Sequence, residues 1–323
     1  MSNLKYCLIF GLLKVVACLP LGVLYVLSDG LYIIARYVLR YRLAVVRKNL
    51  RNALPERSDD ELRRIERAYY RHLCDCIVET VKLLHISDSE MHRRVEIRNV
   101  GEVNASLADG RQVVTFLGHY GNWEWVQLVS TAFRGNDLSG EIYRPLRNQT
   151  MDRIMLRIRS RFDTLCIPQN KAVRTLMRLN FDGKKFVIGF IADQYPNSEN
   201  RRHWTDFLHQ RASYVTGGEE IGRRVDARFF YIEMERPRRG HYIITFRPIE
   251  VPPDSREEYP YTICFLRMLE EHIRRAPEFW LWSHNRWRHK EPVAQPAEPT
   301  EPTEPAAGSA VGAAAAVADD KQR

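Results

Sequence analysis

The chain has 323 residues, of which 45% are hydrophobic and 28% are charged, enough for one large folded domain with accessory segments. The formal net charge is +9, and because the last 32 residues hold five acids and two bases, the body before them carries +12 and favours anionic partners such as lipid head groups, phosphates, an acidic carrier protein or nucleic acid. The six cysteines exclude a zinc or disulfide framework, because Cys74 and Cys76 are too close for the usual zinc pair and have no partner pair, so we interpret all six as reduced thiols.

Residues 1–40 are predicted to be a membrane anchor. Tyr6–Leu27 is a mostly apolar run of 22 residues, long enough to span a bilayer, and Leu31–Leu39 adds a shorter apolar stretch after a break at Ser28–Gly30. The run is too long for a cleaved signal peptide and lacks a small-residue cleavage site. Because Lys14 would cost about 2.5–3.5 kcal/mol near the middle of a bilayer, a hairpin or an interfacial helix in one leaflet is the alternative to a spanning helix.

Residues 41–100 are predicted to be a helical connector. Arg36–Arg51 holds six basic residues and no acid, which either marks the cytoplasmic side of a membrane or also attracts anionic lipid. Ser58–Leu84 has apolar residues at helical spacing, and its first residue is a suitable N-cap with an acid three positions later. Within this helix we interpret Glu79 and Lys82 as solvated or locally paired.

Residues 101–291 are predicted to be a catalytic α/β domain, with a mixed, mostly parallel sheet flanked by helices. Apolar β runs at 112–118, 138–144, 164–168, 185–192, 226–235 and 241–251 alternate with helical patterns at 122–133, 150–162, 171–181, 214–224 and 259–276. The turn Arg236–Gly240 joins the last two runs as a hairpin, so the sheet is expected to be mixed. Residues 292–323 are rich in Pro, Ala, Glu and Thr, cannot bury a core, and are predicted to be a disordered tail.

A histidine stands where the first of these β runs ends. Gly118 closes the run, His119 follows, and Glu124 lies five positions later at the start of a predicted helix. An imidazole can take a proton from a hydroxyl and return it, and a nearby carboxylate can hold its tautomer and stabilise the imidazolium. The structural alternative is a buried histidine with satisfied hydrogen bonds. The spacing is not that of a His-Glu-x-x-His zinc protease.

The segment Gly118-His-Tyr-Gly-Asn-Trp-Glu124 resembles the signature of the lipid A biosynthesis acyltransferases. These enzymes add secondary acyl chains to a lipopolysaccharide precursor and belong to the glycerolipid acyltransferase superfamily. Further segments resemble the same family: Val46–Pro55, Tyr143–Pro145, Gly189–Gln194, Pro277–Arg288 and, more loosely, Ser213–Gly218, which lacks a Phe-Gly pair. The resemblance extends over roughly residues 5–290 and is more specific than any one motif.

The resemblance implies roles for the matched residues. His119 would be the general base, Glu124 would orient its ring, and Arg144 would stabilise the oxyanion or bind substrate. Asp193 would orient Arg144 or bind the acceptor. The predicted substrate-binding residues are Asn122, Asp193, Gln194, Arg147, Arg153 and Arg157. The last two belong, with Arg161, to a basic stripe at four-residue spacing that would receive an anionic ligand or be a solvated helix face.

The implied activity is O-acyl transfer from a thioester of acyl carrier protein or coenzyme A to a hydroxyl of a lipid A precursor. No metal or redox cofactor is implied, because a thioester is already activated. The implied location is the inner membrane, with the catalytic domain on its cytoplasmic face. Two alternatives stay open: the same chemistry on a lysophospholipid, amino-acid lipid or glycolipid, and a basic module that binds anionic lipid or nucleic acid without turnover. No nucleic-acid-binding motif is present, so nucleic acid is not an expected partner.

Overall fold

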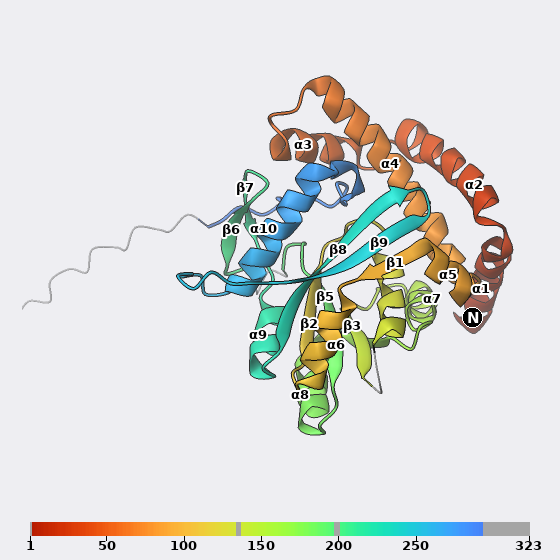
Figure 1. The fold of residues 1–323 in the computed structure, drawn as a ribbon. Coiled ribbons are helices and arrows are strands. Elements are labelled where there is room, and N and C mark those ends of the chain that lie inside the picture. Colours follow the sequence, from red (N-terminus) through yellow and green to blue (C-terminus); the bar gives the residue numbers. More distant parts are fainter. Residues whose placement is uncertain (1, 134–136, 197–200, 293–323) are drawn as a thin grey trace, which may run out of the picture. The chain divides into compact units, whose positions relative to one another are not determined.

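A computed structural model describes residues 2–133, 137–196 and 201–292 (Figure 1). Met1–Glu291 cluster as one compact unit. The predicted tail at 292–323 lies, apart from Pro292, outside the described residues.

Seven strands form one sheet in the order β1-β9-β8-β2-β5-β3-β4. Neighbouring strands run parallel except β8 and β9, which pair antiparallel as the predicted hairpin, so the prediction of a mixed, mostly parallel sheet is confirmed. The strands are β1 (Val95–Arg98), β2 (Val113–Leu117), β3 (Leu138–Tyr143), β4 (Leu165–Pro168), β5 (Phe186–Ile191), β8 (Arg228–Arg238) and β9 (His241–Pro248). A separate antiparallel pair consists of β6 (Trp204–Phe207) and β7 (Gln210–Ser213).

Strand β1 lies inside the segment predicted to be a helical connector. It pairs with β9 at the edge of the sheet, so the sheet begins before residue 101. Its four residues include the charged Glu96 and Arg98 and follow a polar stretch, so the sequence did not distinguish them from a polar linker. The short helices on either side of it, α5 (Asp88–Arg94) and α6 (Val100–Ala108), were likewise not predicted.

Helices cover both faces of the sheet, with β2 fully buried between them. Val113, Leu117 and Val187 belong to the core that includes residues of α6, the 3-10 segment η2 and α7, whereas Phe116 and Ile188 belong to the core with α8, α9 and α10. The covering elements are η2 (Trp123–Ala132), α7 (Gln149–Arg159), α8 (Ala172–Phe181), α9 (Gly217–Arg224) and α10 (Pro260–Arg275), with two short 3-10 turns, η3 (Gln169–Lys171) and η5 (Pro277–Phe279).

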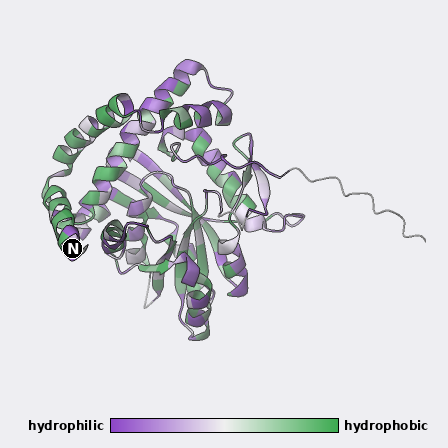
Figure 2. Ribbon diagram, turned by 180° about the vertical axis from the view of Figure 1, so that it is seen from behind, coloured by the Kyte–Doolittle hydropathy of each residue, from purple (hydrophilic) through white to green (hydrophobic). Residues whose placement is uncertain are grey.

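The N-terminal apolar region forms two helices and a π-helical turn: α1 (Ser2–Cys18), α2 (Leu21–Ile33) and η1 (Ile34–Val38). Pro20 stands at the break between α1 and α2, whereas the predicted break at Ser28–Gly30 lies inside α2. Ser28 does not interrupt the helix, because it is buried and its hydroxyl donates to Asp75 at 2.7 Å. Leu21–Val38 is long and apolar enough to cross a membrane, by length and composition only. Figure 2 shows hydrophobic residues along much of α1 and α2.

Helix α4 (Asp59–Lys82) follows α3 (Leu43–Ala53) and carries the predicted N-cap, because the side chain of Ser58 accepts from the main-chain N–H of Glu61. The interpretation of Glu79 and Lys82 as solvated is wrong, since both are buried. The Lys82 ammonium donates to the carbonyl oxygens of Ala17 and Leu19 at 2.9 and 2.8 Å, where it satisfies the C-terminal end of α1. Helix α4 therefore packs against α1 and α2, and its buried Glu79 binds the hydroxyl of Tyr242 in β9.

Candidate active site

The candidate site lies where two central parallel strands end side by side. Leu117 at the end of β2 is in register with Ile191 at the end of β5. His119 and Asp193 each lie two residues beyond these aligned ends, so the fold brings them together although they are 74 positions apart. In open α/β sheets, the carboxyl ends of the strands are the usual position of a binding site.

His119 is held by the carboxylate of Asp193. Its ring Nδ1 donates to Asp193 Oδ1 at 2.7 Å, and its main-chain N–H donates to Oδ2 at 2.9 Å. The indole N–H of Trp280 also donates to Oδ2, at 2.8 Å. Burial by itself raises the pKa of Asp193, but the adjacent His119 and these hydrogen bonds outweigh it and lower the pKa to about 2. Asp193 is therefore an ionised, fully buried group that fixes the ring.

The opposite ring nitrogen of His119, Nε2, is the one that can accept a proton, and the amide of Gln194 lies beside it. Because Nδ1 carries its proton toward Asp193, Nε2 is the nitrogen with a free electron pair. The amide NH₂ of Gln194 lies 3.3 Å from each ring nitrogen and, because Nδ1 is protonated, donates to Nε2. The indole of Trp123 meets the ring edge-on at a centroid distance of 5.2 Å. Such an imidazole is suited to accept a proton from a hydroxyl group.

A cavity of about 850 Å³ opens at this corner, within the range of pockets that hold lipid-sized or drug-sized ligands. Four predicted site residues line it: His119, Glu124, Arg144 and Gln194. Its wall also includes apolar side chains from the sheet and from η2, among them Leu117, Val126, Val129, Val187 and Ile191. The cavity therefore combines a basic nitrogen with a surface that suits a hydrocarbon chain.

Glu124 does not make the contact predicted for it. The carboxylate on the ring of His119 is that of Asp193, and Glu124 binds Arg159 of α7 instead, with Oε2 accepting from Nε at 3.0 Å and Oε1 from Nη2 at 2.6 Å. This two-point contact directs the carboxylate toward the helix that covers the sheet. Glu124, five positions after His119, therefore lies in the cavity wall and does not orient the imidazole.

Glu141 of β3 shares Arg159 with Glu124, at 3.5 Å from Nε. Burial raises the pKa of Glu141 to about 7, and the charge of Arg159 only partly opposes this. Burial also acts to lower the pKa of Arg159, but the hydrogen bonds and charge of Glu124 raise it, so the guanidinium stays charged. One partly buried cation thus faces two carboxylates in the cavity wall.

Replacing Glu141 with glutamine is expected to weaken the pH dependence of stability. Because the pKa of Glu141 is raised from 4.5 to about 7 on folding, its contribution is fully present below about pH 4.5 and is lost as the pH rises through 7. The loss amounts to about 3 kcal/mol between pH 4 and pH 8. Urea unfolding at several pH values should show a smaller fall for Glu141→Gln than for the wild type. The assignment would be contradicted if the free energy of unfolding fell equally with pH in both proteins. It would also be contradicted if the exposed control Glu250→Gln reduced the fall as much as Glu141→Gln.

Two further predictions of substrate binding do not fit the structure. Asn122 is 1% exposed and donates from Nδ2 to Glu79 at 2.7 Å, so it faces the interior behind the corner and is absent from the cavity wall. Asp193 is also outside the lining of the cavity, and its carboxylate binds His119 and Trp280. Arg144 is exposed at the cavity, just after the end of β3.

The predicted basic stripe lies away from the cavity. Arg147 is exposed and is not among the cavity residues. The guanidinium carbon of Arg153 lies 4.0 Å from the ring centroid of Tyr6, and Arg153 donates to Asn3, so it contacts α1. Arg153 and Arg157 both line a second, smaller pocket beside α1. Arg161 binds the main chain near the end of α4.

Arg159, Glu141 and Trp280 were missed by sequence reasoning. Arg159 is two positions from Arg157, about 200° around the helix axis, so it lies on the opposite side of α7 from the predicted basic stripe. The four-residue spacing of that stripe therefore did not indicate it. Trp280 follows η5 and reaches Asp193 from a segment more than 80 residues away in sequence. In the part of the chain that the structure describes, no group of three His, Cys, Asp or Glu side chains could hold a metal ion.

The comparisons with known proteins establish the family. Residues 1–289 match the model of the bacterial lipid A biosynthesis acyltransferases, and the chain belongs to this family. It is 24% identical over 298 residues to the lipid A biosynthesis palmitoleoyltransferase of Escherichia coli K12 and to a lipid A biosynthesis acyltransferase of Shigella flexneri, covering 88% of this chain and 91% of each relative. It is 22% identical over 281 residues to the E. coli K12 lipid A biosynthesis lauroyltransferase, covering 86% and 89%. The protein is therefore an acyltransferase of lipid A biosynthesis.

Proposed function

We propose that this enzyme moves a fatty acyl group from the thioester of an acyl carrier protein to a hydroxyl of a lipid A precursor, with His119 as the general base. The bond from His119 Nδ1 to the buried Asp193 carries the proposal, because it makes Nε2 of this cavity-lining histidine the proton acceptor; the acceptor hydroxyl takes the place of the Gln194 amide there. A coenzyme A thioester would supply the same chemistry. The charge of +12 on the body of the chain favours an acidic carrier protein as donor.

The reaction needs one base that later acts as an acid. His119 Nε2 accepts the hydroxyl proton while the hydroxyl oxygen attacks the carbonyl carbon of the thioester, and the carbonyl oxygen becomes an oxyanion. When the tetrahedral intermediate collapses, the C–S bond breaks and the imidazolium returns its proton to the leaving thiolate. The products are an ester and a free thiol. Asp193 stays ionised throughout and stabilises the imidazolium.

The cavity arginines supply positive charge for the same step. We assign Arg144 to the oxyanion or to a substrate phosphate, because it lies at the cavity just after β3. Glu124 holds Arg159 in the cavity wall, so we assign to Glu124 the shape and charge of that wall in place of the orientation of His119.

The N-terminal helices are proposed to anchor the enzyme to the inner membrane, with the site on the cytoplasmic face. Along α1, Leu4, Leu8, Leu12 and Val15 are each 65% exposed or more. Their spacing places them on one side of the helix, where an aqueous environment would be unfavourable for so much apolar surface. A bilayer would cover this stripe and bring the cavity close to a lipid substrate.

The proposal is tested by identifying the acylated product. Full-length enzyme in its membrane fraction would be incubated with a lipid A precursor and a panel of acyl-carrier-protein and coenzyme A thioesters, followed by mass spectrometry of the lipids. The precursor is expected to gain the mass of one acyl group, most rapidly with a carrier-protein donor. An unchanged precursor beside an acylated lysophospholipid, amino-acid lipid or glycolipid would overturn the acceptor. Equal or better use of coenzyme A thioesters would overturn the donor.

A further inference from the structure

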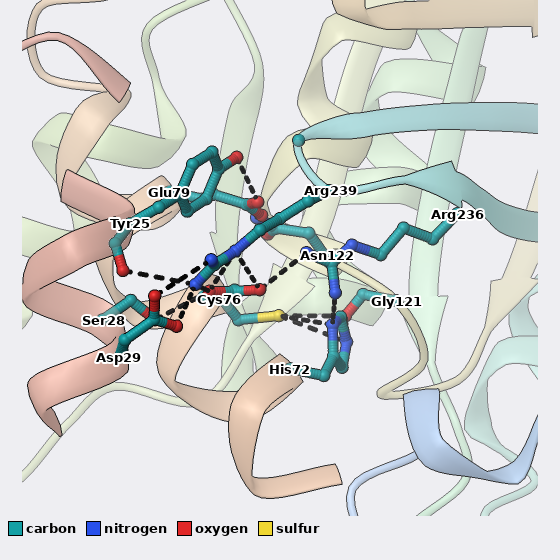
Figure 3. Close-up of polar contacts among 12 residues, drawn as sticks. Tyr25, Ser28, Asp29, His72, Cys76, Glu79, Gly121, Asn122, Arg236 and Arg239 are labelled. Carbon is teal, nitrogen blue, oxygen red and sulfur yellow. Dashed lines mark hydrogen bonds and ion pairs between the residues drawn. The ribbon is translucent and has the colours of Figure 1, made fainter. Parts of the chain in front are cut away.

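We propose that Glu79 of α4 is a positioning residue for the catalytic corner and makes the geometry of that corner depend on the seating of helix α2. The inference rests on the proposed role of His119 as the base. Figure 3 shows Glu79 between Tyr25 of α2 and Asn122, which lies three residues after His119. Glu79 thus links the N-terminal helices to the corner from the side opposite the cavity.

Glu79 accepts hydrogen bonds from three different elements. Oε1 accepts from the hydroxyl of Tyr25 at 2.8 Å, while Oε2 accepts from Asn122 Nδ2 at 2.7 Å and from the hydroxyl of Tyr242 at 2.6 Å. Its side chain is completely buried, and this burial raises its pKa. Three donors converging on two oxygens need an acceptor-only group, which is a carboxylate. A buried polar group with all its bonds made fixes its neighbours strongly, because breaking any bond leaves an unsatisfied partner.

The main chain of the corner is held as well. Arg236 Nη1 lies 3.2 Å from Nδ1 of His72, and because a guanidinium only donates, Nδ1 accepts and Nε2 donates to the carbonyl oxygen of Gly121 at 3.2 Å. Burial, reinforced by Arg236, lowers the pKa of His72 to about 3, so the ring is neutral. Gly121 has a φ of +61°, and a Cβ there would lie 2.6 Å from the sulfur of Met234. The chain two residues after His119 is thus fixed in a conformation that only glycine fits.

Helix α2 is seated on the same network. Ser28 donates to Asp75 of α4, and Arg239 in the β8–β9 turn binds both Asp75 and the carbonyl oxygen of Tyr25 (Figure 3). Gly240, in the same turn, leaves the space that Tyr25 occupies, because a Cβ there would lie 2.1 Å from the tyrosine hydroxyl. The position of the Tyr25 hydroxyl is therefore set by α2, α4 and the hairpin together.

These contacts form one line from α2 through Tyr25, Glu79 and Asn122 to the segment that carries His119. Asn122 is buried and lies outside the cavity wall, so any effect of its side chain on turnover passes through the main chain of the corner and not through substrate contact. Displacement of α2, including its removal from a membrane, would loosen Glu79 and shift the imidazole away from the acceptor hydroxyl. Small displacements of a catalytic group reduce the rate of the chemical step more than substrate binding.

A double-mutant cycle on kcat tests the inference in full-length enzyme reconstituted in lipid vesicles. Tyr25→Phe and Asn122→Ala should each lower kcat by about 3–10-fold, the effect of one lost buried hydrogen bond, with KM within about twofold of wild type. Because both act through Glu79, Tyr25→Phe should cause no further loss in the Asn122→Ala background. Independent effects that multiply, or effects on KM alone, would overturn the inference.

Tyr70→Phe is the matched control. It removes a tyrosine hydroxyl on α4 that donates to the carbonyl oxygen of Tyr41, a bond unconnected with Glu79, and it should leave kcat unchanged. Glu79→Gln keeps an acceptor for Asn122, whereas Glu79→Met does not, so the glutamine variant should retain more kcat when both are assayed well below their melting temperatures. Equal kcat for the two variants would also overturn the inference. Turnover by His119→Ala would instead refute the proposed function, so the two failures are distinguishable.

Discussion

Replacing His119 with alanine is expected to lower kcat by about 10²–10⁴-fold, the usual contribution of a general base. The loss follows from the position of Nε2, which is at the cavity while Nδ1 is bound to Asp193. Acyl transfer would be measured by mass spectrometry of the product with saturating donor and acceptor. KM should change little, because the ring contributes to the proton transfer and only slightly to the area of the cavity wall.

His92→Ala is a suitable control for this experiment, since His92 is exposed and binds Thr131 on the surface. It should retain wild-type turnover. Substantial acyl transfer by purified His119→Ala protein would remove His119 from the mechanism and leave the structural alternative, a histidine held only for packing.

Replacing Asp193 with asparagine is expected to lower kcat by about 10⁴-fold, the size of effect found where the same exchange imposes the wrong tautomer on a catalytic histidine. The main-chain N–H of His119 and the indole N–H of Trp280 both donate to Oδ2, so the amide oxygen must take that position. The amide NH₂ then takes the place of Oδ1 and donates to Nδ1 of His119. The ring proton moves to Nε2, which can no longer accept a proton from a hydroxyl.

The Asp193→Asn protein should stay folded, because the amide has the same shape and keeps both donors to its oxygen. A melting temperature close to that of the wild type would separate loss of the base from loss of structure. If Asp193→Asn retains most of its turnover while Glu124→Gln loses it, the carboxylate that serves the imidazole is Glu124 and the assignment made from the structure is wrong.

Most strands of the sheet and the segment that carries His119 could be predicted from the sequence, because each is marked by a pattern of neighbouring residues. Short apolar runs alternating with helical patterns indicated all the long strands, and the Gly118–Glu124 segment marked the corner that holds His119. Strand β1 was not predicted, because two of its four residues are charged and resemble a polar linker, whereas the equally short β4 is mostly apolar. Elements with few residues depend on their neighbours in space more than on their own pattern.

The partner of His119 could not be predicted, because it depends on the order of strands in the sheet. Asp193 was recognised as the end of a β run, but only the pairing of β2 with β5 places it beside His119. A spacing rule favoured Glu124, which is near in sequence and faces Arg159.

Burial of charge is the second kind of information that the sequence lacked. Glu79 lies on a helix whose apolar pattern indicated a single core face, so its carboxylate was interpreted as solvated or locally paired. The structure packs α2 against the other side of α4, and the glutamate becomes the centre of a buried network with Tyr25 and Asn122. A helix covered on both sides can hold charged residues inside if each has its hydrogen bonds satisfied.

The most direct test of the proposed catalytic centre is the tautomer of His119, read from the ¹⁵N shifts of the ring in histidine-labelled enzyme, with His119→Ala used to assign the signals. In the wild-type enzyme with a neutral ring, the proton is expected on Nδ1, and Asp193→Asn is expected to move it to Nε2 while Glu124→Gln leaves it in place. A proton on Nε2 in the wild type, or a tautomer that responds to Glu124→Gln and not to Asp193→Asn, would contradict the account.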